Sequence, residues 1–548
     1  MIIRSAELDA DSLLSAAICI VGAGAAGITL ACELDGHGVK VILLESGGLK
    51  PDAALVDDYR GIATAPHADP TRFRRAVFGG TTSLWGGRCI PFDPIDFERR
   101  DYLPCSGWPI SYDEVAQHYP RALDYCDAGR FEFTASGSLA RSTPLIRGFD
   151  GGGVIVDDCI ERYSLPTDFG KRYRQKIARS GNVVALLNAR CVGLLKRRGE
   201  DGIEAAEFVD QAGRRRQVRA TVFVLATGGI EVPRLLLNSD SQGSGLGNRN
   251  DLLGRFYSCH FESIYGRVVP NRAAVAFDFE KTTDGIYCRR QLRFSAPAQR
   301  EHRLPNTAFR LHFPDYSDAT HGSSVMSTIY LVKSSLLPEY RAILQHNAWD
   351  TEPSPTWQHV RNVVTGLPQL CRFSRDWVFR IRLARRKLPY TLVPNADGSY
   401  PLEFNCEQTP LDSNRVTLTD DADRHGLRRV HITWRMCQAD VEGGLRAFQL
   451  LADVMNRGHA CRLEYDRDKL RDRLCHATPL GGHHIGTARM AATERAGVVD
   501  ANCAVFGLPN LYVASSAVFP TGSYANPTLT IVALAVRLAA HLKTMVRS

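Results

Sequence analysis

Three glycines near the start of the chain have the spacing of a dinucleotide-binding turn. Gly22, Gly24 and Gly27 fit the pattern G-x-G-x-x-G and follow the apolar run at residues 17–21. In such a turn the first glycine allows a sharp bend, the second lets a pyrophosphate approach the backbone, and the third lets helix and strand pack closely. Because free N–H groups gather at the start of the following helix, we expect negatively charged phosphates to bind there.

A carboxylate stands where the ribose of such a cofactor would bind. Residues 39–44 form a second apolar run that ends at Glu45, and an acid at this position can accept hydrogen bonds from a ribose. A glycine motif alone is weak evidence, but here a strand precedes it, a helix follows it and an acid ends the next strand. The pattern therefore indicates a dinucleotide site. Glu45 disfavours a 2′-phosphate but does not distinguish FAD from NAD.

A histidine and an asparagine far downstream could handle the proton of a hydroxyl group. An alcohol carbon gives up a hydride only as its hydroxyl loses a proton, and a neutral imidazole such as His483 is the best acceptor near physiological pH. Asn526 does not titrate, but its amide can hold a substrate oxygen. Taken singly, most histidines pack or face solvent, and Asn526 before Pro527 could be a plain helix N-cap.

The order of apolar and glycine-rich segments predicts an α/β fold that would position these residues. Residues 17–44 read as strand, helix and strand, and a further helix is expected over 230–238. Pro527 is expected to open a long helix, because proline favours the first helical position. Other strands are expected at residues 182–195, 218–226, 327–332, 415–419 and 511–514.

Size and composition are those of a folded protein with more than one structural unit. The 548 residues exceed the size at which a single hydrophobic core stops growing. A net charge of +8 is small for this length, and the basic clusters at 214–216 and 380–387 lack aromatic interleaving or a nucleic-acid module. We interpret both clusters as solvated faces or loops and predict no nucleic-acid partner.

The cysteines and the chain termini point to a reducing environment. Fifteen cysteines are scattered without a C-x-x-C pair, so we predict no metal site and expect a cytoplasmic protein. The acidic start of the chain does not resemble a secretory signal. The apolar run at residues 531–546 is interrupted by three basic residues and is short for a bilayer, so we expect no membrane span.

The C-terminal segments resemble those of a known enzyme family. Residues 481–487, Gly-Gly-His-His-Ile-Gly-Thr, and residues 519–530, Phe-Pro-Thr-Gly-Ser-Tyr-Ala-Asn-Pro-Thr-Leu-Thr, are similar to the last blocks of the glucose–methanol–choline (GMC) oxidoreductases. The loop around Gly79 and residues 226–231 and 498–514 resemble further blocks of that family, in the same order. Each block alone is unspecific, and the set together is specific.

The resemblance implies FAD and a characteristic division of the chain. We expect a Rossmann-like FAD-binding domain built from discontinuous segments, covered by an α+β substrate domain with an antiparallel sheet. The expected FAD-binding segments are 1–110, 186–260 and 476–548, and the expected substrate-binding segments are 111–185 and 261–475.

The resemblance also assigns the site residues. The histidine of H-x-x-G-T falls on His483, and the second catalytic position, His or Asn in the family, falls on Asn526, a combination similar to choline oxidase and pyranose oxidase. His484 occupies the variable next position, and we weigh packing against substrate contact there. The residues expected to bind FAD are Gly22, Gly24, Ala25, Ala26, Gly27, Glu45, Gly79, Gly80, Thr82, Ser83, Cys191, Val192, Ala226, Thr227, Gly228, Ser515, Asn526, Pro527 and Thr528.

Two departures from the family pattern matter. Some relatives attach the flavin covalently through a histidine in the Gly-Gly loop, where this chain has Leu84, so we expect non-covalent FAD. Many relatives have Ala-Asp-Ala-Ser where this chain has Ala-Ser-Ser-Ala at 514–517, so a ribityl or phosphate contact is expected to pass to Ser515.

The activity that the resemblance implies is oxidation of an alcohol to a carbonyl. Loops between 250 and 440 are rich in Arg, Asp, His and Asn, which favours a sugar, polyol or aminosugar/aminocyclitol glycoside, as in antibiotic biosynthesis, over a sterol. An NAD-linked dehydrogenase would explain the glycine motif but not the C-terminal blocks. A hydroxynitrile lyase and a flavin subunit of a haem-linked sugar dehydrogenase stay open, as do the electron acceptor, oxygen or another, and the oligomeric state.

Overall fold

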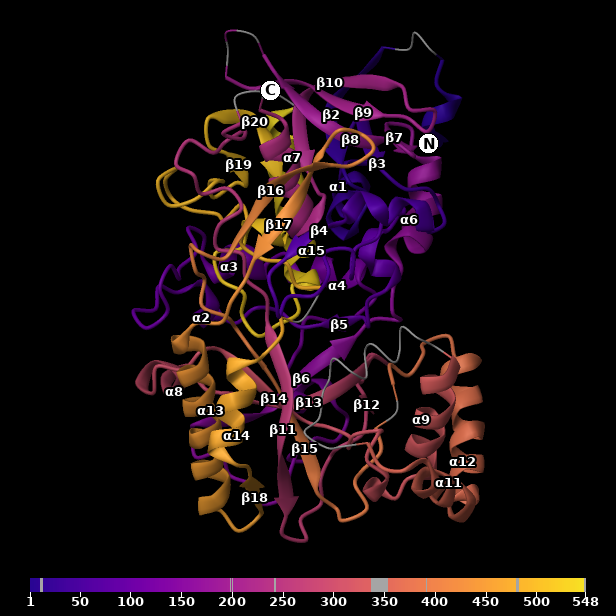
Figure 1. Ribbon diagram of the computed structural model, residues 1–548, viewed down its shortest axis with the longest axis vertical. Helices are drawn as coiled ribbons and strands as arrows, with labels where there is room; N and C mark the ends of the chain where they lie inside the picture. Colours follow the sequence, from indigo (N-terminus) through magenta and orange to yellow (C-terminus); the bar gives the residue numbers. More distant parts are fainter. Residues whose placement is uncertain are drawn as a thin grey trace.

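Two large β-sheets organise the chain, one in the upper half and one in the lower half of Figure 1. The computed structural model describes residues 1–9, 13–197, 199, 201–240, 243–336, 353–390, 392–479 and 482–546. Gly481, the first glycine of the predicted H-x-x-G-T block, lies outside the described residues. The predicted fold class, a Rossmann-like domain with a second domain built on an antiparallel sheet, is confirmed.

The upper sheet has the parallel core expected of a dinucleotide-binding domain. Its strands follow the order β1-β7-β3-β2-β10-β20-β19, and β8 and β9 extend it from β10. β3 is buried along its whole length, as a central parallel strand must be. The strand bounds are β1 Ile2–Arg4, β2 Leu14–Val21, β3 Val41–Glu45, β7 Val183–Leu187, β8 Arg190–Lys196, β9 Ile203–Val209, β10 Arg215–Leu225, β19 Ala504–Val505 and β20 Leu508–Val513.

Helices cover the upper sheet, and one of them follows the predicted glycine turn. α1 (Ala25–Leu34) follows the glycine motif and packs on both α6 (Phe169–Arg179) and α15 (Thr528–Met545). Among the described residues, α15 alone is long and apolar enough to cross a membrane. Its apolar residues, including Leu529, Val532 and Leu538, are buried against α1 and α4 (Tyr119–Tyr125), so it serves as a core helix here.

The lower sheet is antiparallel and has two different faces. Its strands follow the order β18-β11-β15-β14-β13-β6-β5, and β12 pairs with β13. One face packs on α13 (Gln438–Arg457), where Phe448 contacts Phe309 and Phe404 at ring distances of 5.5 and 4.9 Å. The opposite face carries charged side chains. The strand bounds are β5 Arg88–Cys89, β6 Ile155–Tyr163, β11 Phe261–Pro270, β12 Glu280–Lys281, β13 Tyr287–Phe294, β14 Thr307–Leu311, β15 Tyr400–Cys406 and β18 Cys461–Glu464.

A small third sheet lies between the two halves. It consists of β16 (Arg415–Ala422), β17 (Arg428–Thr433) and β4 (Gly61–Ala63), and it packs on α7 (Gly228–Asn238), the helix that follows β10. Residues 415–433, which we assigned to the substrate-binding segments, therefore contact a helix of the upper half. The domain boundaries themselves stay a prediction.

One predicted strand is wrong. Residues 327–332 lie in α9 (Ser324–Leu336), which packs on α11 (Thr356–Thr365). The β-branched residues of this segment favour a strand, but Ser327 bonds His359 of α11 at 3.1 Å and Tyr330 stacks on the same imidazole. Helix–helix packing thus overrides the local strand preference.

Candidate active site

A cavity of about 230 Å³ lies at the carboxyl ends of the parallel strands. Segments far apart in the sequence meet on its wall. The predicted cofactor residues that line it are Gly22, Gly24, Ala25, Ala26, Glu45, Gly80, Thr82, Cys191, Ala226, Thr227, Gly228, Ser515, Pro527 and Thr528. The predicted cofactor residues outside its lining are Gly27, Gly79, Ser83, Val192 and Asn526.

The three motif glycines have three different surroundings. Gly22 has φ +100°, and a Cβ there would lie 2.7 Å from the carbonyl oxygen of Ala226. A Cβ on Gly27 would lie 1.9 Å from the carbonyl oxygen of Gly22, so this position joins helix to strand. Gly24 lines the cavity and a Cβ there would meet nothing within 4 Å. The turn therefore fits a pyrophosphate approaching at Gly24.

The Gly79-Gly80 loop rests on this turn. The N–H of Gly79 donates to the carbonyl oxygen of Ala23 at 2.8 Å, and a Cβ on Gly80 would lie 3.0 Å from Cα of Gly24. The Ser83 hydroxyl bonds the loop's own backbone at Gly80 O, 2.9 Å away. Ser83 therefore stabilises the loop without lining the cavity.

Glu45 is held rigidly at the cavity wall. Its Oε2 accepts the N–H of Ala23 at 2.9 Å and its Oε1 accepts the N–H of Gly47 at 2.8 Å. Burial raises the pKa of Glu45 to about 7, although both N–H groups favour the ionised form. Each oxygen keeps a lone pair that can accept from a ribose hydroxyl, so the geometry fits the predicted role.

The structure brings the predicted catalytic pair into contact. Asn526 Nδ2 lies 3.0 Å from His483 Nε2, and the His260 ring packs on the His483 ring with centroids 4.7 Å apart. Burial, His260, Arg88 and His484 hold the pKa of His483 well below its ordinary value of 6.5. The imidazole is therefore neutral at physiological pH and available as a base.

The environment of the pair has room for hydrogen bonds to a ligand. Neither His483 Nδ1 nor Asn526 Oδ1 has a partner among the described residues, although both atoms are buried. The chain neighbours Gly482, His484 and Pro527 line the large cavity, so the pair lies at its edge. Buried polar atoms are normally paired, so this arrangement is typical of a binding site.

His484 faces the cofactor cavity. Its ring lies 6.1 Å from the ring of Tyr257, and its carbonyl oxygen accepts from the Ser516 hydroxyl at 2.6 Å. Burial, Arg74 and His67 lower the pKa of His484 to about 3, so it too is neutral. The predicted substrate contact of His484 stays a prediction.

The charged face of the lower sheet is turned toward the loop that contains Tyr524 and Asn526. Asn405 Nδ2 donates to the carbonyl oxygen of Tyr524 at 2.9 Å, and Gln291 Nε2 donates to the Tyr524 hydroxyl at 3.1 Å. Tyr524 lies two residues before Asn526. We did not predict this face. The alternation of polar and apolar residues along β13 and β15 was the available signal.

Guanidinium and carboxylate groups alternate across this face. Arg310 donates to Glu403 at 2.7 Å and to Glu161 at 3.3 Å, and all three side chains are buried. Arg88 pairs with Glu161 at 3.5 Å and is 17% exposed. Glu262 is 18% exposed, and burial and Glu403 raise its pKa to about 8. Arg88 and Glu262 are thus the members of this layer that a ligand can reach.

A second set of charges lines the large cavity itself. Glu231 of α7 pairs with Arg74 and lies 3.4 Å from Arg234, and all three residues border the cavity. Although burial opposes it, Arg234, Arg74 and Arg190 lower the pKa of Glu231 to about 2. This set was also missed. Its signal was two charged residues spaced i, i+3 in an otherwise apolar helix.

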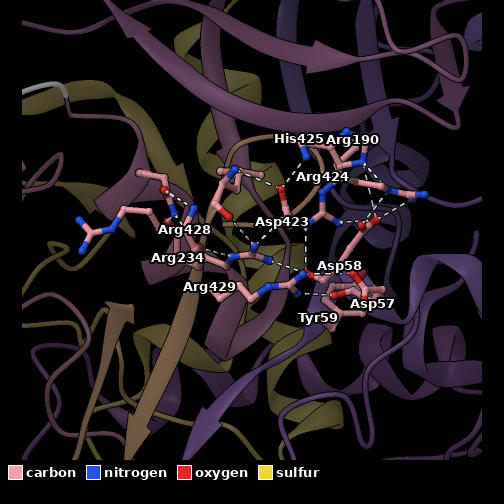
Figure 2. Close-up of polar contacts among 12 residues, drawn as sticks. Asp57, Asp58, Tyr59, Arg190, Arg234, Asp423, Arg424, His425, Arg428 and Arg429 are labelled. Atoms are coloured by element: carbon pink, nitrogen blue, oxygen red, sulfur yellow. Dashed lines mark hydrogen bonds and ion pairs between the residues drawn. The ribbon is translucent and has the colours of Figure 1, made fainter. Parts of the chain in front are cut away.

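Figure 2 shows how this set continues into a buried ionic network. Asp423 accepts from Arg234 at 2.9 Å and from Arg190 at 3.3 Å, and Asp58 pairs with Arg424 at 3.0 Å. The carboxylates of Asp58 and Asp423 are fully buried. The network links β8, α7 and the turn between β16 and β17.

Family models match most of the chain. The model described as FAD dependent oxidoreductase matches residues 17–379, and the model described as GMC oxidoreductase matches residues 410–535.

Curated relatives include several alcohol-oxidising enzymes. The 2-methyl-1,2-propanediol dehydrogenase of Mycolicibacterium austroafricanum is 22% identical over 96% of this chain and 94% of that enzyme. Paromamine 6'-oxidase of Streptomyces fradiae is 24% identical over 95% of this chain and 90% of that enzyme. C-glycoside 3-oxidase of Microbacterium trichothecenolyticum is 36% identical over a segment covering 27% of this chain and 28% of that enzyme.

Solved structures show the same fold. An FAD-dependent oxidoreductase from Chaetomium thermophilum superposes with a TM-score of 0.55 at 15% identity, covering 97% of this chain and 100% of that chain. A fungal aryl-alcohol oxidase superposes with a TM-score of 0.55 at 12% identity, covering 97% of this chain and 99% of that chain.

Proposed function

Because the chain belongs to the glucose–methanol–choline family of FAD-dependent oxidoreductases, we propose that it oxidises an alcohol group of a small polar substrate to a carbonyl. The observation that carries this proposal is the contact between His483 and Asn526 at the edge of the dinucleotide cavity. A base and a non-titrating amide are the groups that alcohol oxidation needs beside a flavin.

His483 and Asn526 divide the work on the substrate hydroxyl. The Asn526 amide donates toward Nε2, which is therefore the unprotonated nitrogen of the ring. A bound substrate hydroxyl would replace this contact and pass its proton to Nε2. The amide then holds the substrate oxygen and fixes the orientation of the carbon. Bound FAD would accept the hydride that this carbon releases. The N-terminus of α15, beginning at Thr528 on the cavity wall, supplies free N–H groups and a positive dipole end toward the cofactor.

FAD is held without a covalent bond in this proposal. Leu84, at the position where some relatives have a histidine, cannot form such a bond, and its side chain is half exposed. Ser515 lines the cavity, which supports a contact to the ribityl chain or a phosphate. Acid denaturation should release all of the yellow colour into the supernatant, and colour that stays with the precipitate would contradict non-covalent binding.

The substrate is a sugar, polyol or aminosugar glycoside in this proposal. The layer facing the catalytic loop offers hydrogen-bond donors and acceptors from Arg88 and Glu262, which match the hydroxyl groups of a polyol. The similar enzymes are named for a C-glycoside, a propanediol and paromamine, which supports this class. The electron acceptor in this proposal is oxygen or another electron acceptor.

A cytoplasmic location is also proposed. All fifteen cysteines are free thiols and most are buried, as expected where thiols are kept reduced.

An anaerobic substrate screen tests the proposal. Sugars, polyols and aminoglycosides are added without oxygen, and loss of the visible flavin absorbance identifies a substrate; air is then admitted to see whether oxygen restores the colour. Bleaching by a substrate excludes hydroxynitrile lyase chemistry, in which the flavin is not reduced. If no alcohol bleaches the flavin, the proposed activity is overturned.

A further inference from the structure

One helical region beside the lower sheet leaves several large apolar side chains exposed. α11 is followed by α12 (Leu367–Trp377) and a π-helical turn, Val378–Arg382, at the lower right of Figure 1. α12 has no buried residue. Leu370, Phe373 and Trp377 recur at i, i+3 and i+7, which places them on one side of the helix. Leu370 and Phe373 are half-buried on α12, which packs on α9, whereas Trp377 is left exposed. Helices in proteins normally gain their stability by burying such a stripe.

Large apolar side chains are concentrated in this region. Trp377 is 43% exposed, and Phe379 and Leu383 are 64% and 68% exposed. On α11, Trp357 is 61% exposed. Such concentration marks an interaction surface, whereas single exposed apolar residues do not. The exposed apolar residues are Trp357, Val360, Val364, Leu367, Trp377, Val378, Phe379 and Leu383. We name these residues, together with the basic residues of the stretch 356–388, the apolar-basic surface.

The same stretch carries nearly all of the net charge of the protein. Residues 356–388 contain eight basic residues and one acidic residue, a surplus of seven positive charges in a chain whose formal net charge is +8. Asp376, the acidic residue, already pairs with Arg375 at 3.1 Å. The surplus is therefore not neutralised within the segment. Residues 380–387 by themselves contain no aromatic residue, but Trp377 and Phe379 directly precede them.

The segment is fixed to the protein at its C-terminal end. Arg386 donates to the carbonyl oxygens of Tyr163 and Asp127 at 3.1 and 2.9 Å. Ser324 of α9 donates to the carbonyl oxygen of Gly366, at the start of α12, at 2.9 Å. The apolar-basic surface is thus presented outward by a positioned scaffold.

We infer that the apolar-basic surface binds the headgroup region of an anionic lipid bilayer. Tryptophan, phenylalanine and leucine side chains on one side of a basic helix enter the boundary between headgroups and acyl chains, while arginines pair with lipid phosphates. Charge complementarity selects an anionic membrane, because residues 356–388 carry a surplus of seven positive charges and Arg372 and Arg375 among them are exposed. The protein would lie on the membrane without crossing it, and α15 takes no part because it is buried in the upper half.

Vesicle flotation of the FAD-loaded protein tests the inference. Vesicles of phosphatidylcholine mixed with phosphatidylglycerol should carry the protein upward, whereas phosphatidylcholine alone should carry little. High salt should release the bound protein, since the attraction is screened. This readout does not depend on activity, so it stands apart from the fate of the proposed function.

Two variants and two matched controls locate the binding surface. Trp377→Glu combined with Phe379→Glu should weaken flotation on the order of tenfold or more. Leu13→Glu, at a 93% exposed apolar position elsewhere, should not. Arg372→Glu combined with Arg375→Glu should abolish the preference for phosphatidylglycerol, whereas Arg174→Glu combined with Lys176→Glu on α6 should leave it unchanged. Retention of the flavin colour shows that each variant is folded. The variant with Arg372→Glu and Arg375→Glu changes only exposed charges. If the aromatic variant does not fold, this arginine variant tests the inference by itself.

Three outcomes would overturn the inference. The first is a protein that does not float with anionic vesicles, or that floats equally with both kinds of vesicle. A second is a dimer in solution that the Trp377→Glu and Phe379→Glu changes dissociate, which would assign the surface to a second copy of the chain. The third is salt-sensitive binding of a single-stranded oligonucleotide, lost in the arginine variant, without any vesicle binding.

Discussion

At the scale of single residues, the catalytic pair owes its properties to its surroundings. In the proposed mechanism His483 is the base, and burial together with His260, Arg88 and His484 keeps it neutral. His260 positions it, since the His260 Nε2 bonds the carbonyl oxygen of Gly522 at 2.9 Å and its ring packs on His483. Because His483 is neutral and Asn526 does not titrate, the pair is suited to accept a proton from a substrate hydroxyl and not to donate one.

Replacement of the base should slow chemistry and leave the cofactor bound. We expect His483→Ala to reduce the rate of anaerobic flavin reduction by ~10²-fold or more, the scale of losing a general base. Stopped-flow absorbance with a saturating alcohol measures this rate. His476→Ala, at an exposed histidine that does not line the cavity, is the control. A near-normal rate in His483→Ala would remove this residue from the mechanism.

The pH dependence of flavin reduction should reflect the lowered pKa of His483. An unperturbed imidazole would lose activity as the pH falls through about 6.5. Because the pKa of His483 lies well below that value, the base form persists and the rate should stay level from neutral pH to below 6.5. The free energy of unfolding should also fall with the pH. A buried histidine with a lowered pKa stabilises the fold fully above pH ~6.5 and less as the pH decreases below that value. A midpoint in the reduction rate at or above pH ~6.5 would contradict the assignment.

Glu262 should act as a neutral hydrogen-bonding group at pH 7. Its pKa of about 8 means that it is protonated below that pH and ionised above it. Glu262→Gln should therefore resemble the wild type at pH 7, while the wild-type KM rises as the pH passes 8 and the variant KM does not. Steady-state kinetics over this range checks the expectation, with the surface change Glu464→Gln as control. A pH-independent wild-type KM would argue against substrate contact by Glu262.

At the scale of elements, the turn between β2 and α1 shows how one loop serves both packing and binding. Gly27 is needed by the protein itself, because its Cα faces the backbone of Gly22. Gly24 is needed only by a ligand, because the space beside it belongs to the cavity. The same residue type is thus required for two unrelated physical reasons.

This difference predicts that Gly27→Ala impairs stability whereas Gly24→Ala impairs cofactor binding. Gly27→Ala should lower the stability of the protein even without cofactor, by ~1–3 kcal/mol as overpacking does. Gly24→Ala should leave the stability of the cofactor-free protein nearly unchanged but lower the flavin content of the purified enzyme. Thermal denaturation of apoprotein and the flavin-to-protein absorbance ratio measure the two effects. Equal behaviour of the two variants would mean that Gly24 does not face the phosphates.

At the scale of the whole molecule, the ionic network in Figure 2 joins segments that the sequence separates widely. Asp423 holds Arg190 of β8 and Arg234 of α7, so the turn after β16 is tied to the upper half. The same guanidiniums contribute to the charge around Glu231 on the cavity wall. The network therefore couples the position of the third sheet to the cofactor cavity.

Removal of one carboxylate from this network should be costly. Asp423→Ala removes the buried carboxylate that Arg190 and Arg234 share, and removing one partner of a buried ion pair costs about 3–5 kcal/mol. Asp420→Ala, which removes the exposed ion pair with Arg428, is the matched control and should not change the melting temperature measurably. If both variants melt together with the wild type, the network contributes nothing to stability.

Local signals made the dinucleotide turn and the main strands predictable. The glycine spacing, the apolar runs and Glu45 are close in sequence, so their geometry follows from backbone sterics alone. Residues 182–195 and 218–226 form strands as expected, whereas residues 327–332 form a helix because their partner, α11, lies across an intervening segment. A local pattern does not contain the partner that decides between strand and helix.

The sequence by itself determined the fold class and the cofactor class, and it predicted His483 and Asn526 as the catalytic pair. These depend on short motifs whose order along the chain is distinctive. The tertiary structure alone decided that the two side chains touch, that His483 is neutral, and that a charged face of the lower sheet bonds to Tyr524, two residues before Asn526. It also decided which apolar helix is core and which is surface: α15 is buried, while α12 is not. Burial, contact and electrostatic potential depend on which distant segments pack together, and that information exists only once the chain is folded.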